Sequence, residues 1–103
     1  MTINSRAKGA RGEREFAEYL RDYGWAAGRG RQYSGSPDSP DVVHDIPGVH
    51  IEAKHTQRTD LYGWMKQAAR DAGDKTPVIF HQKDYEHEML VIMRASDWIK
   101  EIA

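Results

Sequence analysis

Three charged residues of this 103-residue chain stand at the ends of two short apolar runs. Asp41 opens the run "DVV", and the run "VHIEAK" ends with Glu52 and Lys54, two positions apart. Successive side chains of a strand point to opposite faces, so Glu52 and Lys54 are expected to share one face of their strand. Carboxylates and an ammonium group gathered at strand ends can hold a cation beside an anion.

A further acid, Glu13, is predicted to point toward the same place from a helix. At 100° per residue it falls within the apolar stripe made by Phe16, Ala17 and Leu20. A glutamate in such a stripe either has a partner across the gap between helix and sheet, or stays hydrated near the helix N-terminus, where the dipole favours an acid. Both interpretations stay open at this point.

Convergence of Glu13, Asp41 and Glu52 would make the three carboxylates repel one another unless a cation lies between them. Oxygen ligands without sulfur favour Mg²⁺, with Mn²⁺ as its substitute, over Zn²⁺. Such an ion can polarise a phosphoryl group and lower the pKa of a bound water. Lys54 would then orient the water or stabilise the negatively charged phosphate, so the expected chemistry is metal-dependent phosphodiester hydrolysis.

The elements that must position these residues follow an α/β pattern. Periodicity predicts helices over 9–23, 60–73 and 96–102, and strands shortly after residue 24 and over 41–46, 49–54, 76–83 and 88–94. The order α-β-β-β-α-β-β-α predicts a mixed sheet flanked by helices. A tight turn at Pro47-Gly48 is expected to pair the strands 41–46 and 49–54 as a hairpin, which would bring Asp41 near Lys54.

Two further features of the core are predicted from the apolar residues. The strands over 76–83 and 88–94 read as the apolar runs of a buried sheet. The three tryptophans, Trp25, Trp64 and Trp98, are expected to anchor the core.

Composition limits the class of protein. The length suits a single domain over 1–103, and 39% hydrophobic with 30% charged residues is typical of a globular protein. No apolar run is long enough for a membrane span, and the absence of cysteine favours a reducing cytoplasm, bacterial, archaeal or of a phage-infected host. The first 36 residues carry seven basic and four acidic side chains, which is compatible with nucleic acid at that end.

Together, "GEREFAEYL", "SPDVV" and "IEAK" resemble the PD-(D/E)xK nuclease superfamily, and within it the small Holliday junction resolvase-like endonucleases of archaea and phages. The similar layout spans about residues 6–95. It implies a restriction-endonuclease-like fold and metal-dependent cleavage of branched DNA during recombination and repair. It also implies that Glu13, Asp41 and Glu52 bind the metal with the Ala53 carbonyl, and that Lys54 assists the water.

The resemblance implies supporting residues as well. Gln67, in the helix after the lysine strand, occupies the place of a recurrent catalytic glutamine. A serine in the loop before the Pro-Asp strand often accompanies the site, and Ser34 or Ser36 could match it. The doubled Pro-Asp leaves Asp38 as a competitor of Asp41, although Asp41 is preferred because it directly begins the strand.

Basic residues near the predicted site are expected to contact DNA. Arg29 and Arg31 lie in a glycine-rich stretch suited to holding backbone phosphates. Arg6, Lys8 and Arg11 form a basic arm, of which residues 1–8 are expected to be flexible without DNA. By contrast, His50 and His55 lie close to the motif but are expected to be structural or exposed rather than metal ligands.

One site per chain cuts one strand, so symmetric cleavage of a junction implies a homodimer. No membrane and no small organic cofactor are expected. The alternatives are a nicking, repair or restriction-type nuclease acting on duplex or single-stranded DNA, and a non-catalytic nucleic-acid-binding module of the same fold. A small structural protein whose strand-end charges simply face solvent is a third possibility.

Overall fold

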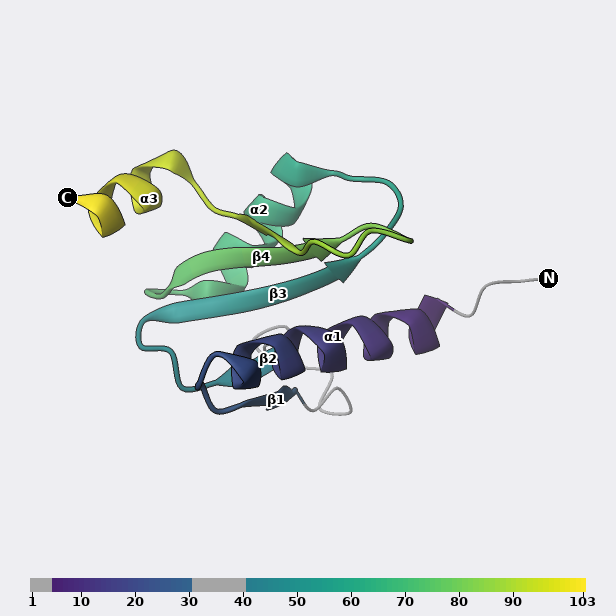
Figure 1. Cartoon of the computed structure of the whole chain (residues 1–103). Coiled ribbons are helices and arrows are strands. Elements are labelled where there is room, and N and C mark those ends of the chain that lie inside the picture. Colours follow the sequence, from purple (N-terminus) through teal and green to yellow (C-terminus); the bar gives the residue numbers. More distant parts are fainter. Residues whose placement is uncertain (1–4, 31–40) are drawn as a thin grey trace.

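The computed structural model describes residues 5–30 and 41–103, and the elements follow the predicted order (Figure 1). They are α1 (Ser5–Asp22), β1 (Ala27–Arg29), β2 (Val42–His44), β3 (Val49–His55), α2 (Leu61–Ala72), β4 (Thr76–Gln82), β5 (Leu90–Ile92) and α3 (Ala95–Ile102). The α/β class and the mixed sheet flanked by helices are therefore confirmed.

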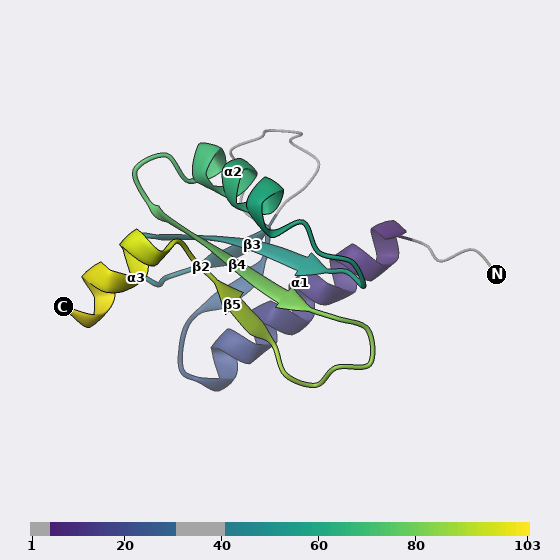
Figure 2. The same cartoon turned by 90° about the horizontal axis from the view of Figure 1, so that it is seen from above.

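The strands form two sheets. In the larger sheet β3 runs parallel to β4, with Glu52 opposite Ile79, and β5 pairs antiparallel with β4 at the edge (Figure 2). A parallel pair needs a crossover, and α2 provides it between β3 and β4. The smaller sheet consists of β1 and β2, paired antiparallel.

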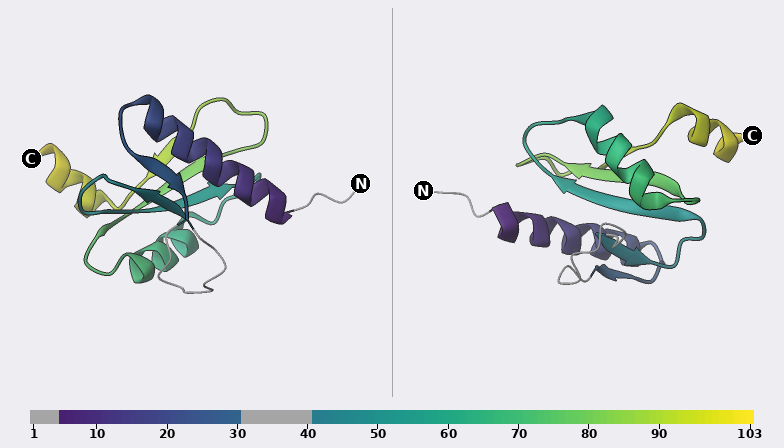
Figure 3. Two further views of the ribbon diagram at one scale, coloured as in Figure 1. Left: turned by 90° about the horizontal axis from the view of Figure 1, so that it is seen from below. Right: turned by 180° about the vertical axis from the view of Figure 1, so that it is seen from behind.

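Helices α1 and α2 lie on opposite faces of the larger sheet (Figure 3). The core between α1 and the sheet holds Phe16, Ala17, Leu20, Val42, Ile51, Val78 and Phe80. The rings of Phe16 and Phe80 meet edge to face, 5.7 Å apart between centroids. A pair in this arrangement adds about 0.5 to 1.5 kcal/mol to the stabilisation from burial, so it fastens α1 to β4.

The alternating side chains of β3 therefore divide between the two helices. Ile51 packs in the α1 core, together with the partly buried Val49 and Ala53. The other face of β3 carries His50, Glu52 and Lys54, and it is turned toward α2. This division, predicted from the two-residue period, puts the charged face of the strand beneath α2.

Three local predictions were wrong. The turn at Pro47-Gly48 is present, with Gly48 at φ +71°, but β2 pairs with β1 and β3 pairs with β4, so no hairpin ladder joins β2 to β3. Strand β5 is an edge strand, with Leu90 and Val91 each 56% exposed. Helix α1 begins at Ser5, four residues before the predicted start at residue 9.

The tryptophans also differ from the core anchors expected of them. Trp64 is half-buried on α2, but the side chains of Trp25 and Trp98 are exposed, Trp98 by 51%. Trp98 lies on α3, which extends from one end of the sheet (Figure 1). Ile99 and Ile102 of the same helix are also exposed. An apolar helix face in solvent raises the question of what covers it.

Candidate active site

Asp41 and Glu52 meet at the edge of β3. Asp41 precedes β2, and its Oδ2 accepts a hydrogen bond from the Ala53 amide at 3.0 Å, which carries its carboxyl group to β3. There it shares a hydrogen bond with the carboxyl group of Glu52. The proximity that was expected from a hairpin thus arises from one side-chain bond to the β3 backbone.

The pKa values of these two acids are driven apart. Burial, together with the neighbouring Glu52 carboxylate, raises the pKa of Asp41 to about 7, against the opposing effect of the Ala53 amide. Burial also acts to raise the pKa of Glu52, but hydrogen bonds with His50, Asp41 and Asp71 outweigh it, and the net shift is downward. Below about pH 7 a proton is therefore held at Asp41, beside an ionised Glu52.

Glu13 lies in the buried stripe of α1, as its position in the helix predicted, and only 6% of it is exposed. Arg29 of β1 forms an ion pair with it, 2.7 Å from Arg29 Nε to Glu13 Oε2. Its charge also contributes to the raised pKa of Asp41. Among the described residues, however, Glu13, Asp41 and Glu52 do not form a group with all ligand atoms within 4.8 Å of one another, so the expected convergence of the three acids is not seen as such a cluster. A buried glutamate requires a partner, and Arg29 is one such partner of Glu13. From the sequence, Arg29 had been predicted only to contact DNA phosphates.

Lys54 lies on the Glu52 face of β3 and is half-buried. Its ammonium group is 5.8 Å from the centroid of the Trp64 ring, so the first half of α2 restrains it by a cation–π contact. Gln67, one helical turn further along α2, is exposed. Asp60 caps α2 by accepting a hydrogen bond from the Gly63 amide at 3.2 Å, which fixes where the helix starts above this face.

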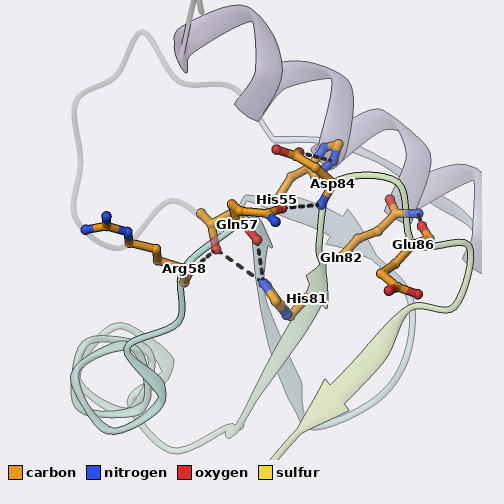
Figure 4. A network of polar contacts seen from close by, with 8 residues as sticks. His55, Gln57, Arg58, His81, Gln82, Asp84 and Glu86 are labelled. Carbon is orange, nitrogen blue, oxygen red and sulfur yellow. Dashed lines mark hydrogen bonds and ion pairs between the residues drawn. The ribbon is translucent and has the colours of Figure 1, made fainter.

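A polar network holds the segment between β3 and α2 (Figure 4). His81 Nε2 of β4 lies 3.0 Å from the Thr56 carbonyl oxygen, and the Thr56 hydroxyl donates to the Arg58 carbonyl at 2.6 Å. The Asp84 amide donates to Gln57 Oε1 at 3.2 Å. These bonds connect the segment after Lys54 to His81 near the end of β4 and to Asp84 just beyond it. The neighbouring strand therefore holds the end of β3 in place.

The residues predicted to bind DNA are only partly described. Arg11 is exposed on α1 and Arg29 is engaged with Glu13, while the backbone of Arg6 and Lys8 belongs to α1. Arg31, Ser34, Ser36 and the competing ligand Asp38 lie outside the described residues. The choice between Ser34 and Ser36 therefore stays a prediction.

Two residues that sequence reasoning did not place in the site lie against Glu52. His50 Nε2 is 2.9 Å from Glu52 Oε1, and Asp71 of α2 shares a hydrogen bond with Glu52. Within residues 5–30 and 41–103, these three form a group whose ligand atoms all lie within 4.8 Å of one another. The spacing of two between His50 and Glu52 was a usable signal, since it puts both on one face of β3.

No helix among the described residues has the length and apolar character needed to cross a bilayer.

The sequence was compared with models of known protein families, and the match found covers the residues of the candidate site. The family model described as archaeal Holliday junction resolvase (Hjc) matches residues 4–70. A comparison with curated protein sequences finds no match. The family match spans about two thirds of the chain and includes Glu13, Asp41, Glu52 and Lys54. This chain therefore belongs to the Holliday junction resolvase family, whose members are PD-(D/E)xK-like nucleases acting on branched DNA.

Proposed function

We propose that this chain is a divalent-metal-dependent endodeoxyribonuclease that hydrolyses phosphodiester bonds in four-way DNA junctions, in recombination and repair. The observation that carries the proposal is the meeting of the Asp41 and Glu52 carboxyl groups on the strand that also presents Lys54. Membership of the resolvase family supports both the reaction class and the branched substrate.

The donor atoms suit Mg²⁺, and Mn²⁺ as its substitute. Asp41 and Glu52 are oxygen donors in contact, and the raised pKa of Asp41 reflects burial and crowding of negative charge, which a cation would relieve. These two acids would hold the ion, with the Ala53 carbonyl as a further ligand and Glu13 acting from α1. The bound ion would supply Lewis-acid polarisation of the phosphoryl group and a water of lowered pKa.

Side chains of the protein would orient the water, stabilise charge on the phosphate and bind the DNA backbone. Lys54 brings a fixed positive charge to the same face as Glu52, where it can orient the attacking water or stabilise charge on the phosphate. Gln67 is proposed to support that water from α2. The exposed Arg11 on α1, with Arg6, Lys8, Arg29 and Arg31, would neutralise backbone phosphates, and the loop serine would be Ser34 or Ser36.

A homodimer would bring two such sites to one junction, and the surface offers a face for it. Exposed apolar side chains lie on three elements: Leu61 and Tyr62 on α2, Leu90 on β5, and Trp98, Ile99 and Ile102 on α3. A groove of about 490 Å³ runs between α2 and the start of α3, with Met65 and Ile92 in its wall. A second copy of this chain is the occupant we propose for this face.

The test uses labelled four-way junction, flap, linear duplex and single-stranded DNA, incubated with the protein and Mg²⁺. We expect the junction to be cut and chelation with EDTA to stop the reaction. Asp41→Asn, Glu52→Gln and Lys54→Ala should each lower the cleavage rate by about 100-fold or more while circular dichroism stays that of the folded wild type. His87→Gln, an exposed histidine on the β4–β5 loop, is the matched control and should cut normally.

The other candidate functions give different results in the same experiment. Equal cutting of linear duplex and junction would identify a nicking or restriction-type nuclease. Salt-sensitive junction binding with no cleavage, indifferent to metal and to Asp41→Asn, would identify a non-catalytic binding module.

Metal binding has a readout that is independent of cleavage. Because the ion would bind the folded site and not the unfolded chain, millimolar Mg²⁺ should raise the melting temperature. The increment should disappear in Glu52→Gln. A melting temperature that is the same with and without Mg²⁺, both alone and with bound junction DNA, would contradict the proposed site.

A further inference from the structure

A mixed nitrogen and oxygen cluster lies on the α2 face of β3, beside the pair formed by Asp41 and Glu52. His50 and Glu52 of β3 and Asp71 of α2 each offer one ligand atom, and these atoms are all within 4.8 Å of one another. His50 and Glu52 are 5% and 4% exposed, while Asp71 is half-buried. Unlike a patch of surface acids, this cluster is sunk between a helix and a sheet.

The position of Asp71 within α2 is unusual for an acid. Ala68 and Ala72, four residues apart, are both buried against the sheet, and Asp71 follows Ala68 by three residues. Residues three or four apart are neighbours on a helix face, so Asp71 borders the packing stripe of α2 beside Ala68. An acid beside a packing stripe requires a partner, and here its neighbour is another carboxylate, Glu52.

The cluster has an opening of its own. A cavity of about 240 Å³ is lined by both His50 and Asp71, with Val42, Val49 and Ala72 in its apolar wall. Lys75 also lines the cavity and is exposed. A small solute can therefore reach the His50 imidazole and the Asp71 carboxylate through this cavity, part of whose wall is formed by β2.

Carboxyl groups outnumber the other charged groups around His50, so a cation would be stabilised there. Glu52 and Asp71 bring two carboxylates to one imidazole, and Asp41 adds a third carboxyl group beside Glu52. Of the nearby cationic side chains, Arg70 opposes the rise that burial and Glu52 cause in the pKa of Asp71, and Lys75 lines the cavity, but both are exposed to solvent. The ammonium group of Lys54 lies over the Trp64 ring, toward the other end of α2 from Asp71. One nitrogen and two oxygen donors suit a divalent ion of the first transition series, whereas Mg²⁺ prefers oxygen ligands and retained water.

We propose that His50, Glu52 and Asp71 bind a divalent transition-metal ion, with Mn²⁺ favoured over Mg²⁺, and that this site shares Glu52 with the ion held by Asp41. The inference rests on the proposed function through that shared ligand. It adds two ligands, one of which, Asp71, lies just beyond the segment that the family model matches. A shared carboxylate between two ions is a recurring arrangement in phosphodiester hydrolysis.

The experiment measures Mn²⁺ bound to the full-length, metal-free protein without DNA. Continuous-wave electron paramagnetic resonance counts the bound ion, and pulsed measurements detect coupling of Mn²⁺ to the ¹⁴N nucleus of a ligating imidazole. We expect bound Mn²⁺ with ¹⁴N coupling in the wild type, persisting in the presence of a tenfold excess of Mg²⁺. His50→Gln should lose the coupling, and Asp71→Asn should weaken Mn²⁺ binding about tenfold while keeping it.

Matched controls are available nearby. His87→Gln removes an exposed imidazole and Asp74→Asn an exposed carboxylate three residues from Asp71, and both should behave as the wild type. Bound Mn²⁺ without ¹⁴N coupling in the folded wild type would overturn the inference, as would coupling that survives His50→Gln. Should His50→Gln fail to fold, labelling the wild type with ¹⁵N-histidine decides, because a ligating histidine must then change the coupling.

Failure here is distinguishable from failure of the proposed function. Asp41→Asn should abolish junction cleavage and leave the nitrogen-coupled Mn²⁺ in place. A wild type that cuts junctions but shows no ¹⁴N coupling refutes this site and retains the nuclease. A wild type with ¹⁴N coupling that cuts none of the DNAs in Mg²⁺ or Mn²⁺ refutes the nuclease and retains the site.

Discussion

The carboxyl group of Asp41 lies against that of Glu52 at the edge of β3, where Asp41 also accepts a hydrogen bond from the Ala53 amide. Asp41 comes from the residue before β2, and Glu52 comes from β3. With burial, this contact raises the pKa of Asp41 to about 7, which makes the metal-free site sensitive to pH.

The sign of that sensitivity can be worked out. An unfolded chain loses the Asp41 proton near its ordinary pKa of about 4, whereas the folded protein keeps it up to about pH 7. Between these values the folded state binds more protons than the unfolded state, so stability falls as pH rises. In EDTA, Asp41→Asn should reduce that fall in the free energy of unfolding by on the order of 2 kcal/mol.

Urea unfolding at pH 4.5, 5.5 and 7.5 measures this difference. Asp74→Asn, which removes an exposed aspartate, is the control and should keep the wild-type pH dependence. A pH dependence unchanged in Asp41→Asn would show that the proton is not held there.

The contact between Lys54 and Trp64 predicts a role for the tryptophan in cleavage. Trp64→Leu keeps an apolar side chain on α2 but removes the ring face that lies 5.8 Å from the ammonium group. A cation–π contact contributes about 0.5 to 1 kcal/mol, so the cleavage rate at saturating junction should fall about two- to fivefold. Trp98→Leu, on α3, is the control. It should leave the cleavage rate at saturating junction unchanged when the protein concentration is well above the dimer dissociation constant.

The ion pair between Glu13 and Arg29 predicts a stability effect. Glu13 is only 6% exposed, so loss of a cationic partner leaves more of its charge poorly compensated. Arg29→Ala should lower the free energy of unfolding by about 1 to 3 kcal/mol, and the loss should shrink in the background of Glu13→Gln. Arg14→Ala, at an exposed position of α1, is the control in chemical denaturation. Equal losses in both backgrounds would mean that the pair is not coupled.

Close packing of α1 on β3 predicts opposite effects for two glycines of the same helix. A Cβ on Gly12 would lie 2.7 Å from the His55 Cβ, so α1 must move, whereas a Cβ on Gly9 meets nothing within 4 Å. Gly12→Ala should destabilise the protein by about 1 to 3 kcal/mol despite the better helix propensity of alanine. Gly9→Ala should stabilise it by roughly 0.5 to 1 kcal/mol. Thermal unfolding of the two variants side by side tests the packing directly.

The apolar face on α2, β5 and α3 predicts a concentration-dependent dimer. Trp98 is half-exposed there, and a buried tryptophan at an interface is often worth 2 kcal/mol or more. Trp98→Ala should therefore raise the dimer dissociation constant about 10- to 100-fold in sedimentation equilibrium. Tyr85→Ala, at a fully exposed loop position, should not change it. A wild type that stays monomeric at all concentrations would rule out this interface.

Much of the site's layout was predictable because it depends on short-range geometry. The two-residue period of a strand puts Glu52 and Lys54 on one face, and the helical period puts Glu13 in the stripe of Phe16. The element order followed from the same periods. These relations need no knowledge of how distant segments pack.

Pairing between distant segments was not predictable in the same way. A turn at Pro47-Gly48 is compatible with a hairpin, yet β2 found its partner in β1 and β3 in β4. A parallel partner with a helical crossover buries both faces of β3, which a local hairpin would not do. The exposed strand β5 and the exposed Trp98 likewise depend on which surfaces the remaining chain covers.

The sequence by itself determined that Glu52 and Lys54 share one face of β3 and that Glu13 lies in the apolar stripe of α1, because backbone periods of two and of 3.6 residues act within a few positions. Only the tertiary structure decided their partners: Glu52 for Asp41, Arg29 for Glu13, and Asp71 for Glu52. Each of these contacts joins separate segments. Their choice rests on packing and charge compensation across the fold, which no local pattern records.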